Sequence, residues 1–241
     1  MTTTKRHFMS PNSNLISVVE AASQLNVHPS RVRAMAHARQ LNAEKIAGRW
    51  LINQASIDHR QESVVVNGRP FDSANAWALL NIAEGHPVDW PSPSALSRLR
   101  GKLRDRGLSG LAPRLRARAQ PMYLRAHPSV IDRIASEPGV VKGGVSAAAA
   151  SGIDIQPSDE LEAYAPRGRV DSIVAKYHLE PSDRPNVVLR VVADDDPFHW
   201  RGRVGPAIAA IDLYESRDPR SRRAAKQFLE NFDAERQRHG R

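Results

Sequence analysis

The segment from Ser17 to Ile52 restricts the fold of this chain more than any other, because it holds two helix signals, a tight turn and a basic hairpin. Ser17-Val-Val-Glu20 is a capping box, in which Ser17 bonds the N3 amide and Glu20 reaches back to the N-cap. Pro29 suits the first position of a second helix. Apolar residues recur at helical spacing in both stretches. We therefore predict two helices of two to three turns, joined by a turn at Asn26-Val27.

The hairpin that follows has the sequence pattern of the wing in a winged helix-turn-helix. Residues 44–46 and 49–52 alternate as strands around Ala47-Gly48, where glycine permits a positive φ. Trp50 is expected to pack against the helices, and Lys45 and Arg49 to point toward a phosphate backbone. Two helices joined by a tight turn form a helix-turn-helix, whose second helix enters the DNA major groove. The candidate DNA contacts here are Ser30, Arg31, Arg33, His37, Lys45 and Arg49.

The charge of the chain favours the same kind of partner. It has 35 lysines and arginines against 26 aspartates and glutamates, a net charge of +9 and an isoelectric point near 10.4. Such an excess favours nucleic acid, with a merely basic surface as the alternative. Between Ser94 and Arg125 nine basic residues meet one acid, Asp105. We predict phosphate contacts there, with a solvated face as the alternative. The candidates are Arg98, Arg100, Lys102, Arg104, Arg106, Arg114, Arg116 and Arg118.

Several classes of protein are disfavoured by what the sequence lacks. It has no cysteine, which excludes disulfides, thiolate metal sites and a cysteine nucleophile. It has no apolar run of about 18 residues and no secretory signal, so we expect a cytoplasmic, nucleoid-associated protein without membrane contact. The histidines form no metal-binding pair, and no nucleotide-loop or nucleophile-elbow motif occurs. Asp194-Asp195-Asp196 is expected to be a solvated loop rather than a Mg²⁺ site. We expect a non-enzymatic protein with no metal or cofactor.

The expected fold class is α+β, with an N-terminal winged helix-turn-helix, a basic helical middle and a C-terminal mixed α/β region. A second winged helix is an open alternative for the middle, and the C-terminal region is expected to bind a protein partner or to form a homodimer. The expected divisions are a flexible arm at residues 1–14, the winged domain at 15–62, the basic helical domain at 70–138, the α/β domain at 139–235 and a frayed tail at 236–241.

The N-terminal segment resembles the excisionase/MerR-type winged helix-turn-helix family. The resemblance rests on VVEAASQLNV, PSRVRAMAHARQL, AEKIAGRWLI and NQASIDHR, in that order. It covers about a fifth of the chain. It departs from the family at His28, where a small capping residue is usual, and at Asn53, where proline is common. The resemblance implies sequence-specific binding to double-stranded DNA.

The second half is similar to AbiEi-type antitoxins of type IV toxin–antitoxin pairs. The similar pieces are YLRAHPSVIDRI, GGVSAAAASGIDI, LEAYAPRGRVDSIVAKYHLEPSDRPNVVLRVV and IAAIDLYESRDPRSRRAAKQFL. Antitoxins of this kind usually begin with a different winged helix. The resemblance implies a repressor that regulates its own operon and neutralises a nucleotidyltransferase toxin. The alternative is an excisionase-like or MerR-like regulator of a mobile element without a toxin partner.

Overall fold

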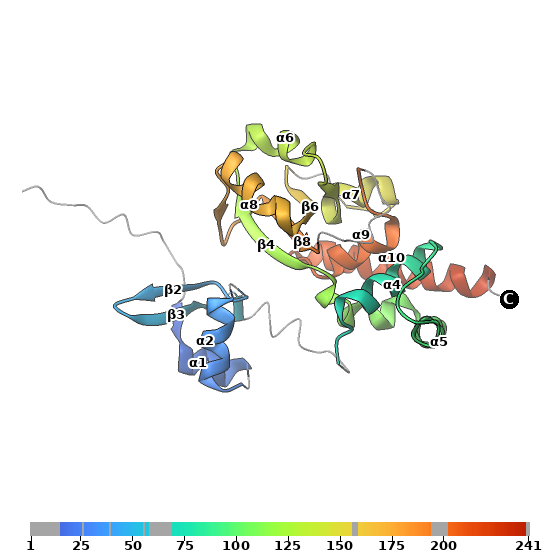
Figure 1. Ribbon diagram of the computed structural model, residues 1–241, viewed down its shortest axis with the longest axis horizontal. Coiled ribbons are helices and arrows are strands. Elements are labelled where there is room, and N and C mark those ends of the chain that lie inside the picture. Colours follow the sequence, from blue (N-terminus) through green and yellow to red (C-terminus); the bar gives the residue numbers. More distant parts are fainter. Residues whose placement is uncertain are drawn as a thin grey trace, which may run out of the picture. The chain divides into compact units, whose positions relative to one another are not determined.

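The computed structural model describes residues 15–25, 27–38, 40–54, 56–57, 69–155, 159–193 and 202–239. The chain divides into two units, Met1–Val65 and Val66–Arg241, which are described separately below (Figure 1). The arm expected at residues 1–14 and the Asp194–Asp196 loop lie outside the described residues.

The first unit combines two helices with a three-stranded antiparallel sheet in the order β1-β3-β2. Its elements are β1 (Leu15–Ser17), α1 (Val18–Leu25), α2 (Pro29–His37), β2 (Ala43–Ile46) and β3 (Arg49–Asn53). The core between helices and sheet contains Val18, Ala21, Ala22, Val32, Met35, Ala36, Leu41, Ile52 and Ile57. The predicted helix, turn, helix and hairpin are confirmed. β1 was not predicted, because three residues are too short to show strand alternation.

The second unit is built on a five-stranded mixed sheet in the order β5-β6-β8-β4-β7. Its strands are β4 (Gln120–Arg125), β5 (Val141–Lys142), β6 (Leu161–Pro166), β7 (Glu180–Pro181) and β8 (Val187–Val192). β6 and β8 are parallel, while β4 runs antiparallel to β8 and β7. α8 (Arg167–Lys176) connects β6 toward β8, as a parallel pair requires.

The two faces of this sheet differ in chemistry because side chains alternate along each strand. One face is apolar and packs against α8 and α6 (Ile131–Ala135), with Ala163, Val187 and Leu189 buried in the contact. The opposite face carries Glu162, Tyr164 and Arg190, and it is buried under α9 (Pro206–Tyr214). The sheet is therefore covered on both sides, although its sequence pattern alternates.

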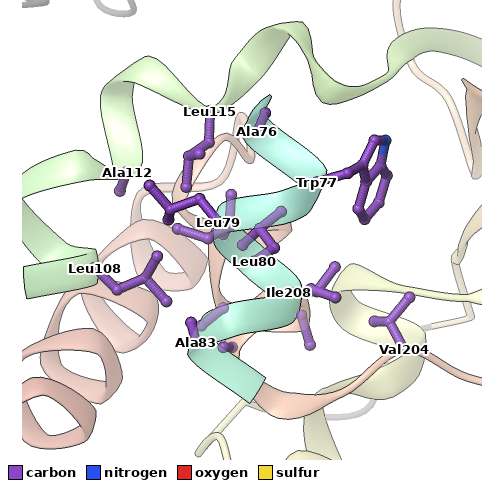
Figure 2. Close-up of a cluster of buried hydrophobic side chains, with 14 of the residues drawn as sticks. Ala76, Trp77, Leu79, Leu80, Ala83, Leu108, Ala112, Leu115, Val204 and Ile208 are labelled. Atoms are coloured by element: carbon purple, nitrogen blue, oxygen red, sulfur yellow. The ribbon is translucent and has the colours of Figure 1, made fainter. Parts of the chain in front are cut away.

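A helical layer that includes α9 covers this polar face of the sheet and forms the largest core. It consists of α4 (Ser73–Glu84), α5 (Pro93–Leu111), α9 and α10 (Pro219–His239), with α7 (Gly144–Ala148) beside it. Short 3-10 turns occur at Ala112–Arg114, Arg116–Arg118, Pro128–Val130 and Ala149–Ser151. Figure 2 shows Trp77, Leu80 and Ala83 of α4 among Leu108, Leu115 and Ile208. Every labelled side chain in this cluster is nearly or fully buried.

Two carboxylates distant in sequence cap helix ends inside this layer. Glu84 accepts the N–H groups of Ala207 (2.7 Å) and Ile208 (3.2 Å) at the start of α9. Asp233 accepts the N–H groups of Leu108 (2.6 Å) and Ser109 (2.9 Å). These N–H groups are free for capping because Gly107, with φ 68° and ψ 170°, interrupts the helical path of α5. A Cβ atom at Gly107 would lie 2.3 Å from Asp233, so only glycine fits there.

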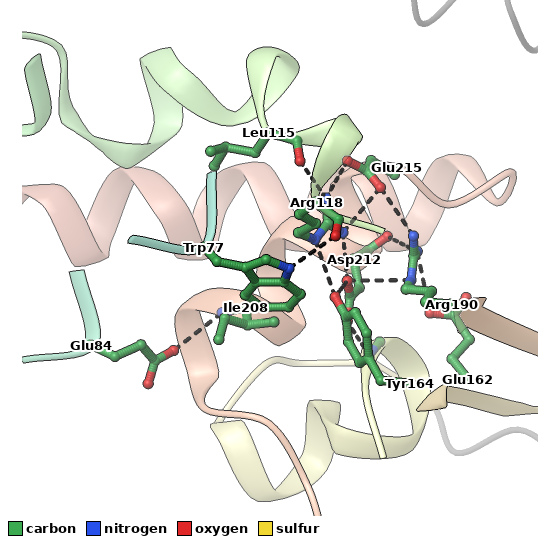
Figure 3. A network of polar contacts seen from close by, with 11 residues as sticks. Trp77, Glu84, Leu115, Arg118, Glu162, Tyr164, Arg190, Ile208, Asp212 and Glu215 are labelled. Carbon is green, nitrogen blue, oxygen red and sulfur yellow. Dashed lines mark hydrogen bonds and ion pairs between the residues drawn. The ribbon is translucent and has the colours of Figure 1, made fainter. Parts of the chain in front are cut away.

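A buried network of charged groups, which we call the arginine network, joins the sheet to α9 (Figure 3). Arg118 bonds Asp212 (2.6 Å) and Glu215 (2.6 Å). Arg190 bonds Glu215 (3.0 Å) and lies 3.3 Å from Asp212. Tyr164 accepts a bond from Arg118 Nε (3.1 Å) and donates its hydroxyl proton to Asp212. The network therefore ties the segment before β4 and the strands β6 and β8 to one helix.

Three of the expected divisions are corrected by these contacts. The expected boundary between residues 138 and 139 falls inside the second unit, because β4 pairs with β8 and α5 packs against α10. Residues 70–138, all described, form no second winged helix, since their single strand β4 pairs only with β7 and β8. The tail expected to fray from residue 236 is helical to His239, and Arg236 donates to the carbonyl of Ala83 (2.7 Å).

Candidate DNA-binding surface

The two helices of the first unit are fixed at their starts and at the turn between them. Glu20 accepts the N–H of Ser17 (2.8 Å), and Ser17 Oγ accepts the N–H of Glu20 (3.2 Å), which completes the predicted capping box. These bonds from Ser17 lower the pKa of Glu20. In the turn, Val27 N–H bonds the carbonyl of Ala22 (3.0 Å). The angle between α1 and α2 is thus set by backbone hydrogen bonds as well as by the core.

His28 is the cap of the second helix. Its Nδ1 accepts the backbone N–H of Ser30 (3.3 Å) and lies 2.9 Å from Ser30 Oγ. Pro29 occupies the first helical position, where a missing N–H costs nothing. His28 therefore does the work of the small capping residue that is usual at this position. The same His-Pro-Ser pattern caps the turn at His127, whose Nδ1 accepts the N–H of Ser129 (3.3 Å).

The face of α2 away from the core displays the predicted contact residues. Val32, Met35 and Ala36 are buried, while all the candidates on α2 are exposed: Ser30, Arg31, Arg33 and His37. With 3.6 residues per turn, Ser30 and His37 lie near the middle of the outward face, and the two arginines flank it on opposite sides. A side chain on such a face reaches base edges in a major groove.

The centre of the outward face also holds a residue that the sequence analysis does not single out. Ala34 is exposed and lies between Ser30 and His37 on α2. Its spacing of four residues from Ser30 was the signal available in the sequence. A methyl group there suits contact with the methyl group of thymine.

The hairpin has the turn that its sequence predicts. Ala47 has φ 47° and Gly48 has φ 80°, so both central residues are in the left-handed region, as a two-residue hairpin of this twist requires. The ring of Trp50 meets the ring of His37 edge-on at a centroid distance of 5.2 Å. The prediction that Trp50 packs toward the helices is confirmed, and this contact joins the hairpin to α2.

The two basic residues of the hairpin do not lie on the same side. Lys45 pairs with Trp50 and Ile46 pairs with Arg49 across the strands. Lys45 therefore shares the face of Trp50 that is turned to α2, and Arg49 lies on the opposite face with Ile46, which is 48% exposed. The register, which a two-residue turn fixes, thus places the two basic side chains on opposite faces of the hairpin. Their contacts with phosphate stay a prediction.

The basic cluster of the second unit separates into exposed and packed residues. Among the eight candidate residues the exposed ones, all on α5, are Arg98, Arg100, Lys102, Arg104 and Arg106. Arg114 is half-buried, stacks on the ring of Phe71 at 4.5 Å and donates to the carbonyl of Arg69 (2.9 Å). Arg116 is also half-buried.

Arg118 does not belong to any surface. Its side chain is fully buried and makes hydrogen bonds to Asp212, Glu215, Tyr164 and the carbonyl of Leu115. The prediction that Arg118 contacts phosphate is wrong. Its side-chain partners follow it by about 45 to 100 residues in the chain, so the local basic context gave no sign of them.

The described residues contain neither a cluster of candidate metal ligands nor a helix that could span a membrane. Among them no three histidine, aspartate or glutamate side chains lie together as a group that could hold a metal ion. Within the same part of the chain, no helix is both long and apolar enough to cross a membrane.

Comparison with known proteins bears on the first unit alone. Residues 15–64 match the family model described as a helix-turn-helix domain. The chain has no match among curated proteins and none among solved structures. The antitoxin resemblance of the second half stays a prediction. The match coincides with the two capped helices, the exposed face of α2 and the hairpin, so residues 15–64 are a DNA-binding helix-turn-helix domain.

Proposed function

We propose that this protein is a sequence-specific transcriptional repressor that reads duplex DNA with α2. The observation that supports this is the outward face of α2, which gathers exposed Ser30, Arg31, Arg33 and His37 opposite a buried apolar seam. Arginines at the start of a recognition helix are placed for bidentate contact with guanine. The protein acts by binding, without catalysis and without a metal or cofactor.

Replacing Arg31 and Arg33 with alanine is expected to weaken specific binding by about 1–3 kcal/mol for each base contact removed. The probe is a duplex selected from a random pool by the full chain, and the measurement is a titration at fixed salt. The matched control replaces Arg220 and Arg223, two exposed arginines at the start of α10, and should keep wild-type affinity. A folded double variant at Arg31 and Arg33 with unchanged affinity for the selected duplex would refute the proposal.

A narrower form of this function is an antitoxin that represses its own operon and neutralises a nucleotidyltransferase toxin through the second unit. What supports it is the resemblance of four stretches in the second half, all within the unit Val66–Arg241. A dedicated partner surface fits a second unit that has its own cores. The alternative remains an excisionase-like or MerR-like regulator without a toxin.

The product of the neighbouring gene tests the narrower form. In cells that express a neighbouring nucleotidyltransferase, the full chain is expected to restore growth, and so is the variant with Arg31 and Arg33 replaced by alanine. Residues 1–65 alone are expected to give no rescue, since this cut leaves the second unit out without breaking its sheet. Growth restored equally by residues 1–65, or no rescue by the full chain, would favour the regulator without a toxin.

A further inference from the structure

The helix α5 has an outward face that the recognition helix does not account for. From Pro93 to Arg106 its buried side is the seam Leu96, Leu99 and Leu103, which packs into the core beside α4 and α10. On the line directly opposite this seam lie Ser94, Ser97, Gly101 and Asp105. We call this line the small ridge, because three of its four residues have little or no side chain.

Basic side chains run along both sides of the small ridge. Arg98, Lys102 and Arg106 form one row at spacings of four residues, and Arg100 and Arg104 form the other. All are exposed. From Arg98 to Arg106 five basic residues meet one acid, a net charge of +4. The one ion pair recorded for these side chains in the described part of the chain joins Arg104 to Asp105 at 3.6 Å.

That ion pair neutralises little of the charge. The side chains of Arg104 and Asp105 are 82% and 69% exposed, and exposed pairs of this kind contribute little. Like charges held this close repel one another unless an anion neutralises them. The charge of α5 is thus available to a partner.

The helix that carries these rows is held rigidly. Ser92 Oγ accepts the N–H of Ala95 (3.4 Å) at its start. At its end Gly107 turns the chain, and Asp233 of α10 holds the next two N–H groups. A rigid helix loses little entropy when it binds, which favours an extended contact over a flexible charged tail.

We infer that α5 is a second duplex-DNA surface, in which the small ridge faces a groove and the two basic rows reach the phosphates of both strands. A major groove about 12 Å wide admits an α-helix, and small residues on the ridge let the backbone approach closely. The contacts are to phosphates, so this surface adds affinity without choosing sequence. The inference rests on the proposed function in that both surfaces engage DNA.

The chemistry of the face favours DNA over a protein partner. Apart from Pro93 at its start, its outward positions hold serine, glycine, arginine, lysine and one aspartate. The centre of a protein interface is depleted in charge and enriched in aromatic residues, whereas a protein–DNA interface is polar and strongly positive. Two DNA surfaces on one chain also raise each other's occupancy through effective concentration.

The test uses the full chain with Arg31 and Arg33 replaced by alanine, so that the recognition helix contributes less, and a duplex of random sequence titrated over a range of salt. One variant changes Arg98 and Lys102 to glutamine, and a second changes Arg100 and Arg104. Each is expected to flatten the plot of log affinity against log salt by about 0.9 per lost phosphate contact. The matched control changes Arg220 and Arg223 on α10 and should keep the slope.

Two further substitutions test the sign of the charge effect and, separately from charge, the close approach of the small ridge to the groove. Asp105→Asn should tighten binding, because it removes a negative charge from the ridge. Gly101→Gln keeps every charge and favours the helix, yet should weaken binding because it blocks close approach. A Cβ atom at Gly101 meets only the flexible end of Arg104 at 3.9 Å, so the variant should fold.

The outcomes that would overturn the inference are specific. They are a slope unchanged by either pair, a flattening matched by the control on α10, or binding of poly-glutamate in place of the duplex. Failure of the recognition helix is seen separately, as specific binding that is insensitive to Arg31 and Arg33. The role of α2 as the recognition helix and the role of α5 as a second DNA surface are therefore tested by different measurements.

Discussion

Replacing Arg118 with methionine is expected to lower the free energy of unfolding of the second unit by about 3–5 kcal/mol. The side chains of Arg118 and Asp212 are both 0% exposed, and Arg118 holds Asp212 and Glu215 at 2.6 Å each. Removing the cation leaves Asp212, which water does not reach, and Glu215, whose side chain is 21% exposed, without their strongest partner. Burial opposes the charge on Arg118, but Glu215, Tyr164 and Asp212 raise its pKa well above the ordinary value, so it is charged in the fold.

Urea unfolding of the full chain measures this effect, since Trp77 donates its ring N–H to the carbonyl of Arg118 (2.9 Å) and its fluorescence reports on the second unit. The matched control is Arg100→Met on the exposed side of α5, which should change stability by less than about 0.5 kcal/mol. Arg118→Lys should recover little, because one ammonium group cannot replace a planar fork with several partners. Equal urea midpoints for Arg118→Met and Arg100→Met would contradict the role of the network.

The elements of the first unit were predictable because their signals are local. The capping box Ser17–Glu20, Pro29 at a helix start and Gly48 in a tight turn each specify the backbone within a few residues. The exposed face of α2 followed from helical spacing alone. The opposite faces taken by Lys45 and Arg49 follow from the strand register, which the sequence analysis did not derive.

In the second unit, the burial of the polar face of the sheet could not be predicted from local sequence signals. Glu162, Tyr164 and Arg190 alternate with apolar residues, a pattern typical of a sheet with one face in water. That face is instead buried under α9, where Asp212 and Glu215 neutralise it. No short stretch of sequence indicates such a contact, since the partners come from separate segments. Asp212 inside the otherwise apolar α9, followed by Glu215 directly after the helix, was the nearest available sign.

The same limit explains the misplaced domain boundary. The basic run from Arg98 to Arg118 reads as one feature in sequence, and it suggested a domain of its own. In the fold, the environment of the basic run changes at Gly107. The basic side chains before Gly107 are exposed, whereas the chain after Gly107 enters the core. Charge density identified the exposed face of α5, but pairing with β8 placed β4, and the ion pair with Asp212 of α9 placed Arg118.

Raising the pH from about 4.5 to about 7 is expected to destabilise the second unit, because Glu162 holds its proton more tightly in the fold. Burial, the dominant cause, raises the pKa of Glu162 to about 7 from an ordinary value of 4.5. Arg190, whose Nη2 lies 3.9 Å from Glu162 Oε2, lowers this pKa in part, as does the N–H of Val145. Asp212 and Glu160 raise it further.

The sign follows from proton counts in the two states. Between these pH values the unfolded chain has released the Glu162 proton and the folded chain has not, so the folded state binds more protons and stability falls as pH rises. The stabilisation is complete below the unfolded pKa and is lost once pH passes the folded one. A difference of this size corresponds to about 3 kcal/mol. Burial also raises the pKa of Glu84, which contributes in the same direction.

Glu162→Gln isolates the contribution of this residue, because an amide mimics the protonated carboxyl and does not titrate. Urea unfolding at pH 5, 6, 7 and 8 should show the difference between wild type and variant growing with pH, with the variant more stable at pH 8. The exposed Glu230 on α10 supplies the control, and Glu230→Gln should follow the wild-type profile. Parallel profiles for wild type and Glu162→Gln would mean that Glu162 is ionised throughout. Arg190, whose Nη2 lies 3.9 Å from Glu162 Oε2, would then hold that negative charge in the fold.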